Sequence, residues 1–391
     1  MTRKHGICML NPFYFPYPGG TEKHIYEVSK RLAKMGYDVT VLCAPHKSGL
    51  PREEIIEGVR VRRIRWATTL YHLPRPLPPP LAINPLQPFD IHELAKECEL
   101  FHIHNRFVYN LLDVAQIKKI EKRKLAITLH NARPHGIDFA TDLLGGLYDD
   151  TMGYRIFKSC DAIAANSRDT LETTLPQEFW GKATVVYNGV DEKFFSPHNK
   201  GDAVVDNLGL EEKKVVFCVA RFVEQKGLKY LLEAMAQVLK KEKDAKLILL
   251  GRGPLEGEFK SRVKKLGIGK SVDLVTERIS EGDLAQFYAA CDVFALPSLW
   301  EPFGMVFTEA MATGKPVIGT KIGGIPEVIS PDVGFVVPPR DPKTLADRLL
   351  ELLKDDALRK KMGAAARRRV EKLFTWDHSA RGYDEFYKKT L

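Results

Sequence analysis

The chain has 391 residues and a mass of 44.2 kDa, about twice the usual size of one domain, and 44% of its residues are hydrophobic. The charged fraction of 28% and the aromatic fraction of 9% exclude a disordered or fibrous protein. The net charge of +9 suggests a polyanionic partner, but the basic residues are spread over both halves of the chain, so phosphorylated small molecules fit equally well. We therefore expect two globular domains and no nucleic-acid partner.

The six cysteines are far apart in the sequence, and none stands in a C-x-x-C motif. They read as buried thiols, which indicates a reducing compartment. The apolar stretch at residues 6–17 is interrupted by Asn11 and Pro12 and does not resemble a signal peptide. We expect a cytoplasmic protein. The lysine-rich stretch at 118–124 could touch the inner face of a membrane, although a solvated face is the favoured reading.

Short apolar runs rich in β-branched residues alternate with segments of helical periodicity in the first half of the chain. These runs are Gly6–Leu10, Asp38–Cys43, Val59–Ile64, Leu100–Ile103, Leu125–Leu129, Ala162–Ala165 and Thr184–Tyr187. The alternation is typical of βαβ units, so it predicts a parallel sheet covered by helices.

Between Leu70 and Pro88 the chain carries seven prolines, which disfavour both helix and central strand. We predict an extended loop there. It is either a structural connector or a lid that contacts an acceptor, and the sequence does not decide between them.

The alternating pattern begins again in the second half. Its apolar runs are Val215–Val219, Lys246–Leu250, Val272–Val275, Val293–Leu296, Val317–Gly319 and Phe335–Val337. We predict a second doubly wound α/β domain, with the seam near Asp191–Asp202. From Pro342 the chain is helical, and its last segment carries an aromatic face that must be buried. That face consists of Phe374, Trp376, Tyr383, Phe386 and Tyr387.

Two features place possible phosphate ligands near strand ends. Gly19-Gly20 precedes an amphipathic helix whose free amides and dipole would favour an anion, although a tight turn explains the glycines as well. Arg221 and Lys226 follow the first strand of the second half, on the side of a parallel sheet where ligands bind. Together they would make a diphosphate clamp, and the alternative is two solvated charges on a loop.

The stretch from Pro297 to Ala312 combines two acids with a helix start. Glu301 precedes the expected helix, Phe303-Gly304-Met305 offer free amides, and Glu309 lies within an otherwise apolar helix. Carboxylates accept hydrogen bonds from paired sugar hydroxyls, and amides suit phosphate or hydroxyl oxygens. This arrangement suits a nucleotide sugar. Compensation of the helix dipole could explain Glu301, but it does not explain Glu309.

These motifs resemble the family-four retaining glycosyltransferases (group 1), which have the GT-B fold. The resemblance rests on Glu301 and Glu309 around Phe303-Gly304, and it extends over nearly the whole chain. It also includes Gly19-Gly20, His104, His130, Asn166-Ser167, Asn188-Gly189-Val190-Asp191, Arg221, Lys226-Gly227, Gly251-Arg252-Gly253-Pro254, Gly323-Gly324-Ile325-Pro326-Glu327 and Phe374-Thr375-Trp376.

The resemblance implies two tandem Rossmann-like domains that face a central cleft, with the C-terminal helix crossing back to the first domain. Residues 1–193, with the returning helix at 374–391, would form the acceptor side. Residues 194–373 would bind the donor.

The resemblance also assigns roles to individual residues. Arg221 and Lys226 would bind the donor diphosphate, Glu309 the ribose, Glu301 and the backbone of Phe303, Gly304 and Met305 the transferred sugar, and Gly19 and Gly20 a phosphate. His130 would face the reacting sugar, with a structural role as its alternative. For His102 and His104 the structural role is favoured.

The implied reaction moves a hexose from a UDP-, GDP- or ADP-sugar to an acceptor hydroxyl with retention of configuration. The chain has no D-x-D sequence, so we expect no catalytic metal and no cofactor. The acceptor could be a sugar, a sugar phosphate, a glycerate or a lipid-linked molecule. The nucleobase also stays open, because Thr276-Glu277-Arg278 stand where similar proteins often have a glycine. Two rival functions are a non-catalytic nucleotide-sugar binding subunit and a nucleotide-sugar epimerase.

Overall fold

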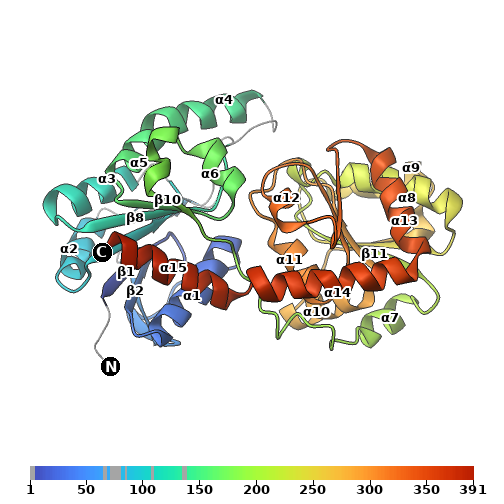
Figure 1. The fold of residues 1–391 in the computed structure, drawn as a ribbon, viewed down its shortest axis with the longest axis horizontal. Coiled ribbons are helices and arrows are strands. Elements are labelled where there is room, and N and C mark those ends of the chain that lie inside the picture. Colours follow the sequence, from blue (N-terminus) through green and yellow to red (C-terminus); the bar gives the residue numbers. More distant parts are fainter. Residues whose placement is uncertain (1–4, 65–67, 71–80, 84–85, 107–109, 134–138) are drawn as a thin grey trace. The chain divides into compact units, whose positions relative to one another are not determined.

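The computed structural model describes residues 5–64, 68–70, 81–83, 86–106, 110–133 and 139–391. The chain divides into two compact units (Figure 1). Unit 1 comprises Met1–Asn188 and Trp376–Leu391, and unit 2 comprises Gly189–Thr375. From the sequence, these boundaries were expected after residues 193 and 373. Each unit is an α/β fold around its own sheet, as predicted, and the sheet is parallel except for one edge strand in unit 1.

The sheet of unit 1 has the strand order β10-β9-β8-β7-β1-β2-β4-β3. Its strands are β1 (Gly6–Leu10), β2 (Asp38–Cys43), β3 (Glu53–Ile56), β4 (Val59–Arg63), β7 (Leu100–His104), β8 (Lys124–Leu129), β9 (Ala162–Ala165) and β10 (Ala183–Val185). Ile7 of β1 pairs with Val39 on one side and Leu100 on the other, both in parallel register. Helices on both faces bury these strands, which explains their continuous apolar runs.

Only the edge strand β3 of this sheet was not predicted, and it pairs with β4 in antiparallel register. Its sequence, Glu-Glu-Ile-Ile, lacks the apolar run of the buried strands because it lies at the sheet edge. Every predicted strand is present, and its ends differ from the prediction by no more than two residues.

The helices of unit 1 are α1 (Gly20–Lys34), α2 (Gln87–Ala95), α3 (Asn110–Ala115), α4 (Phe139–Tyr148), α5 (Tyr154–Ser159), α6 (Arg168–Thr174) and α15 (Trp376–Thr390). The C-terminal helix α15 packs against α1 (Figure 1), and Arg31 of α1 donates to Asp377 of α15 at 2.6 Å. Its aromatic face is buried, with Trp376, Tyr383 and Tyr387 fully enclosed. The prediction that the last helix returns to the first domain is therefore confirmed.

The sheet of unit 2 is parallel throughout and has the order β13-β12-β11-β14-β15-β16. Its strands are β11 (Lys214–Val219), β12 (Ala245–Leu250), β13 (Val272–Val275), β14 (Val293–Leu296), β15 (Val317–Thr320) and β16 (Gly334–Val337). Its helices are α7 (Asp202–Leu208), α8 (Leu228–Lys241), α9 (Glu256–Lys265), α10 (Glu281–Ala290), α11 (Met305–Ala312), α12 (Ile325–Val328), α13 (Pro342–Lys354) and α14 (Asp356–Leu373).

The proline-rich segment lies mostly outside the described residues. Its described parts include two short strands, β5 (Thr68–Leu70) and β6 (Leu81–Ile83), which pair in antiparallel register. At its far end Pro88 stands in the first turn of α2, so the prediction of an extended loop up to this residue was wrong. A proline is tolerated there because the first amides of a helix have no intrahelical partner.

All six cysteines are buried free thiols, as predicted. Among the described residues, no helix combines the length and the apolar character that crossing a membrane requires.

Candidate functional site

Each sheet has a point at which the strand order reverses. In unit 2 the chain leaves β11 toward β12 and β13, and it later returns to the opposite side of β11 as β14. The carboxyl ends of β11 and β14 therefore flank a topological switch point, where ligands bind in open α/β sheets. Arg221 and Lys226 follow β11, and Glu301 follows β14, so the fold collects these three predicted residues at one edge.

Lys226 and Glu301 form a salt bridge at this edge. The Lys226 Nζ donates to Glu301 Oε2 at 2.5 Å, and both side chains are more than four-fifths buried. Arg221, in contrast, is exposed. Lys226, the predicted partner of the phosphate, and Glu301, the predicted partner of the sugar hydroxyls, therefore neutralise each other's charge.

The loops after β11 and β14 are held together through their backbones. Gln225 accepts hydrogen bonds from the amides of Leu299 at 2.7 Å and Trp300 at 3.3 Å through its carbonyl oxygen. Gly227 has a φ of +60°, and a Cβ atom there would lie 2.1 Å from the Pro297 carbonyl oxygen. Only glycine permits this approach, which brings Lys226 next to Glu301.

The backbone on the other side of Glu301 is also fixed. Its carbonyl oxygen accepts a hydrogen bond from Gly324 at 3.2 Å. A Cβ atom at Gly323, whose φ is +52°, would lie 2.0 Å from the same oxygen. The Gly323-Gly324 motif is therefore explained locally, because it lets the backbone lie close to Glu301 and fix its position.

Helix α11 begins beside this pair. Gly304 is its N-cap with a φ of +88°, and no side chain of the described residues caps the first turn. The amides of Met305 and Val306, at the very start of the helix, have no carbonyl group of the preceding turn to pair with, which makes this end suitable for an anion, whereas the Phe307 amide already donates to the Gly304 carbonyl oxygen at 3.0 Å. Phe303 is buried, so its side chain serves packing.

Glu309 lies on α11 with 7% of its surface exposed. It accepts a hydrogen bond from the Tyr288 hydroxyl on α10 at 2.8 Å. Burial and the neighbouring Glu309 carboxylate raise the pKa of Tyr288 well above its ordinary value, so the hydroxyl remains a donor. Tyr288 was not among the predicted site residues, because no sequence spacing between α10 and α11 signals this contact.

In unit 1 the switch point lies between β1 and β7. Gly19 and Gly20 stand at the start of α1, where Gly19 is the N-cap. The side chain of Glu22 lies against Gly19 and accepts a hydrogen bond from Asn11 at 3.2 Å. Burial raises the pKa of Glu22. A phosphate at this helix end would meet the Glu22 carboxylate, a neighbour that the sequence analysis did not identify.

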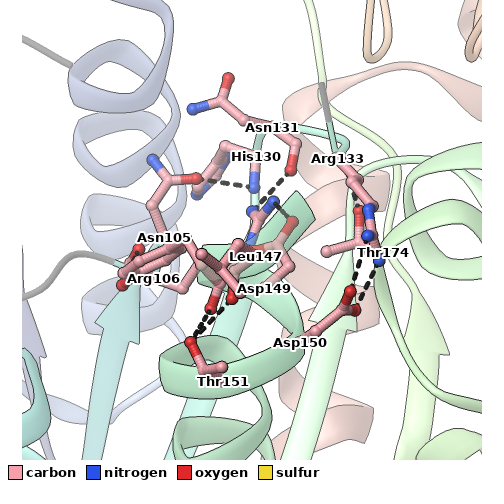
Figure 2. A network of polar contacts seen from close by, with 11 residues as sticks. Asn105, Arg106, His130, Asn131, Arg133, Leu147, Asp149, Asp150, Thr151 and Thr174 are labelled. Carbon is pink, nitrogen blue, oxygen red and sulfur yellow. Dashed lines mark hydrogen bonds and ion pairs between the residues drawn. The ribbon is translucent and has the colours of Figure 1, made fainter. Parts of the chain in front are cut away.

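His130 follows β8 and is buried (Figure 2). Its amide donates to Asn105 Oδ1 at 3.0 Å, and its carbonyl oxygen accepts from Asn166 Nδ2 at 3.0 Å. Its Nε2 lies 2.9 Å from His104 Nδ1. Burial and the neighbouring His24 and His102 hold the pKa of His130 well below its ordinary value, so the ring is neutral at pH 7.

A second network supports the strand ends next to His130. Figure 2 shows Arg106 between Asp149 and the carbonyl oxygen of Asn131, to which its Nη1 donates at 2.9 Å. Arg106 and Asp149 form a bidentate ion pair that is almost completely buried. Neither residue of this pair was predicted from the sequence. It holds the backbone directly after His130, because Asn131 is the next residue.

Comparison with known proteins agrees with this architecture. The family model described as "Glycosyltransferase Family 4" matches residues 18–194, and "Glycosyl transferases group 1" matches residues 203–369. An uncharacterized glycosyltransferase of Methanocaldococcus jannaschii is 27% identical over 98% of this chain and 97% of its own length. The N-acetyl-alpha-D-glucosaminyl L-malate synthase of Bacillus anthracis is 27% identical over 96% of each chain.

Among solved structures, the Anabaena protein HepE in complex with UDP-glucose superimposes with a TM-score of 0.76 at 22% identity, covering 99% of this chain and 100% of that one. This likeness shows the fold. The two family models lie one after the other and together span most of the chain, one in each unit. The chain therefore belongs to the group 1, family 4 glycosyltransferases and has the GT-B fold.

Proposed function

We propose that the chain transfers a hexose from a nucleoside diphosphate sugar to an acceptor hydroxyl, with retention of the anomeric configuration and without a catalytic divalent metal. The family membership supports group transfer of a sugar. The UDP-glucose bound to HepE supports a nucleotide-sugar donor.

One observation carries the proposal for the donor. Lys226 and Glu301 pair at the switch point of unit 2, next to the uncapped start of α11. When the bond to the diphosphate breaks, negative charge develops on the leaving oxygen. Lys226, the neighbouring Arg221 and the first amides of α11 are the groups that would stabilise it. These groups could provide the charge that a bound metal ion supplies in other transferases.

The two acids would recognise hydroxyl groups. Once a phosphate has replaced Glu301 as the partner of Lys226, Glu301 can accept hydrogen bonds from the hydroxyls of the transferred sugar. Glu309 would accept them from the ribose, with Tyr288 holding one of its carboxylate oxygens. A carboxylate has about four lone-pair sites, so the tyrosine and two hydroxyls can be accommodated together.

Retention would follow from attack on the same face from which the diphosphate leaves. The acceptor oxygen bonds to the anomeric carbon as the bond between that carbon and the phosphate oxygen breaks. The proton of the acceptor hydroxyl passes to the departing phosphate oxygen. This scheme needs no carboxylate nucleophile.

Unit 1 would supply the acceptor side. His130 is proposed to act on the transferred sugar, and Gly19 and Gly20 to contact a phosphate, with Glu22 protonated or displaced. The acceptor would be a sugar, a sugar phosphate, a glycerate or a lipid-linked hydroxyl.

The proposal is tested by a two-step experiment. A thermal-shift screen of UDP-, GDP- and ADP-hexoses should identify a donor, because a ligand that binds the native state raises its apparent stability. The purified chain with that donor should then transfer the sugar to one of the acceptor classes, and NMR of the product should show a retained anomeric configuration. Donor binding without transfer to any acceptor would favour a non-catalytic subunit, and a changed sugar without acceptor would favour an epimerase.

A further inference from the structure

Four histidines gather in the interior of unit 1. His24 lies on α1, His102 and His104 on β7, and His130 directly after β8. They are exposed by 0%, 0%, 2% and 6%, respectively. Neighbouring rings contact one another, so the group forms one continuous buried cluster.

Within this cluster, both ring nitrogens of His102 have hydrogen-bond partners. Its Nδ1 lies 2.6 Å from the Tyr387 hydroxyl, and its Nε2 lies 2.8 Å from Thr128 Oγ1. Both ring nitrogens are therefore engaged with hydroxyl groups. This pattern is typical of a structural histidine, which is the role that the sequence favoured for His102.

The other histidines leave nitrogen atoms unused. The Nε2 atoms of His24 and His104 are buried and have no hydrogen-bond partner among the described residues. Asn188 Oδ1 accepts from His24 Nδ1 at 2.8 Å. Since an amide oxygen can only accept, the proton of His24 is on Nδ1 and the lone pair is on Nε2. Within the part of the chain that the structure describes, no group donates a hydrogen bond to this lone pair.

The spacing of the three rings suits a shared ligand. His24, His104 and His130 each offer a nitrogen atom, and these three atoms lie within 4.8 Å of one another. The ring centroids are 4.7 Å apart for His24 and His130, 5.2 Å for His104 and His130, and 6.1 Å for His24 and His104. Three imidazoles on one tetrahedral zinc ion, with Zn–N bonds of about 2.0–2.1 Å, place their centroids about 5 Å apart.

We propose that His24, His104 and His130 form a binding site for a divalent transition metal ion of the zinc class. Three histidines with a fourth position left for water or an anion are a common coordination of zinc. Imidazole ligands favour zinc, cobalt, nickel or copper over magnesium. Asn188 orients His24 from behind, as a typical outer partner of a ligating histidine does. The metal replaces the hydrogen bond between His104 and His130.

The proposed metal site shares His130 with the proposed function, in which this residue acts on the transferred sugar. The expectation that transfer needs no metal concerns the donor site in unit 2, whereas this site lies in unit 1. It links α1 to the ends of β7 and β8. A bound ion also engages the Nε2 of His130, so the loaded and metal-free forms differ in the availability of that nitrogen.

The test is a cobalt titration of the full chain, prepared metal-free and without a histidine tag. Cobalt bound by three imidazoles in a tetrahedral field should give an intense visible absorption band, which saturates at one ion per chain and disappears when zinc is added. Trp376 gives a second signal, because its ring lies 5.8 Å from that of His24 and its fluorescence should be quenched by bound cobalt. A wild-type chain that gives no such band would overturn the proposal.

Matched variants locate the site. His24→Gln and His104→Gln should each lower the affinity for cobalt by at least about 100-fold, because each removes a ligand. Asn188→Ala keeps all three ligands and should lower it by about 10- to 100-fold. His102→Gln alters a buried histidine of the same cluster whose nitrogens are already engaged, and it should retain the ion. Unchanged affinity in folded His24→Gln and His104→Gln, checked by circular dichroism, would place the metal elsewhere and overturn the proposal.

Discussion

Lys226 and Glu301 are 75 residues apart in the sequence, yet their side chains are joined at 2.5 Å. The pair stands where two loops are held together by the backbone of Gln225 and by the close approach of Gly227 to Pro297. A charged pair in this position can exchange partners. A diphosphate can bind the ammonium group of Lys226, and the carboxylate of Glu301 can then bind sugar hydroxyls.

This exchange predicts different effects for the two residues. Lys226→Ala should weaken binding of the free nucleoside diphosphate by about 1.5–3 kcal/mol, the scale of a hydrogen bond to a charged group. Glu301→Gln should leave that affinity nearly unchanged and lower the turnover of the intact donor. Isothermal calorimetry with UDP, GDP and ADP measures the first effect, and steady-state kinetics measures the second.

The stability of the same variants supplies a control. Lys226→Ala leaves the largely buried Glu301 carboxylate without its partner and should cost about 1–3 kcal/mol of unfolding free energy, whereas Glu301→Gln keeps an oxygen that can accept from Lys226 and should cost less. The double variant should cost less than the sum of the two. Equal losses of nucleotide affinity in both single variants would contradict the division of roles.

A second prediction separates two explanations for Glu309. If it binds the ribose, Glu309→Ala should weaken nucleotide binding by about 1.5–3 kcal/mol. Tyr288→Phe removes the hydroxyl that donates to Glu309 but keeps the carboxylate, so it should lower stability while nucleotide affinity changes far less. Calorimetry on both variants, with urea unfolding alongside, measures the contrast. If Glu309→Ala binds nucleotide normally in a folded protein, its role is limited to packing with Tyr288.

The sequence predicts most of the fold because buried parallel strands require apolar runs. The central strands β1 and β11 are enclosed on both faces and flanked by other strands, so their apolar character shows directly in the sequence. The edge strand β3 was not predicted because it has a neighbouring strand on one side only and lacks an apolar run. The prediction that proline excludes a helix was wrong at Pro88, because a residue in the first turn of a helix does not need an amide to donate within the helix.

The site was only partly predictable. Residues that follow strands, such as Lys226 and Glu301, can be located because the carboxyl ends of parallel strands meet at one edge. Contacts between distant segments give no local signal. The bond between Tyr288 and Glu309 and the cluster of His24 with His104 depend on how separate helices and strands pack, so they became visible only in three dimensions.

The third prediction concerns His130. If it acts on the sugar in the transition state, His130→Ala should lower kcat by about 100-fold or more and leave the affinity for free nucleotide nearly unchanged. His102→Ala, in the same buried cluster, is the matched control and should act mainly through stability. A His130 variant with normal kcat toward the identified acceptor would remove this residue from the reaction.

The fourth prediction is that the transfer needs neither magnesium nor manganese. Activity should persist in buffer treated with EDTA, because Lys226, Arg221 and the amides of α11 carry the charge stabilisation. Zinc should be added back in a separate sample, since chelation would also empty the proposed histidine site. Activity that is lost with EDTA and restored by magnesium or manganese alone would show that the charge argument is wrong.

The last prediction concerns stability and pH, and it depends on the buried Asp113 of α3. The carboxyl group accepts a hydrogen bond from Gln87 Nε2 at 2.7 Å, but burial dominates and raises its pKa from 3.8 to about 7. Between these two values the unfolded chain has lost the proton while the folded chain keeps it. The unfolded state then binds fewer protons, so the unfolding free energy should fall as the pH rises from about 4 to 7.

Asp113→Asn removes this titration and keeps the shape of the side chain, and Gln87 can turn its amide to match the new donor. The other titrating groups are common to both proteins, so the difference between variant and wild type isolates Asp113. That difference should shift in favour of the variant by up to about 4 kcal/mol across this pH range, because one pKa unit corresponds to about 1.4 kcal/mol. Urea unfolding at half-unit pH steps measures it. A difference that does not change with pH would mean that Asp113 is already ionised in the folded protein and that its hydrogen bonds, instead of burial, control its charge.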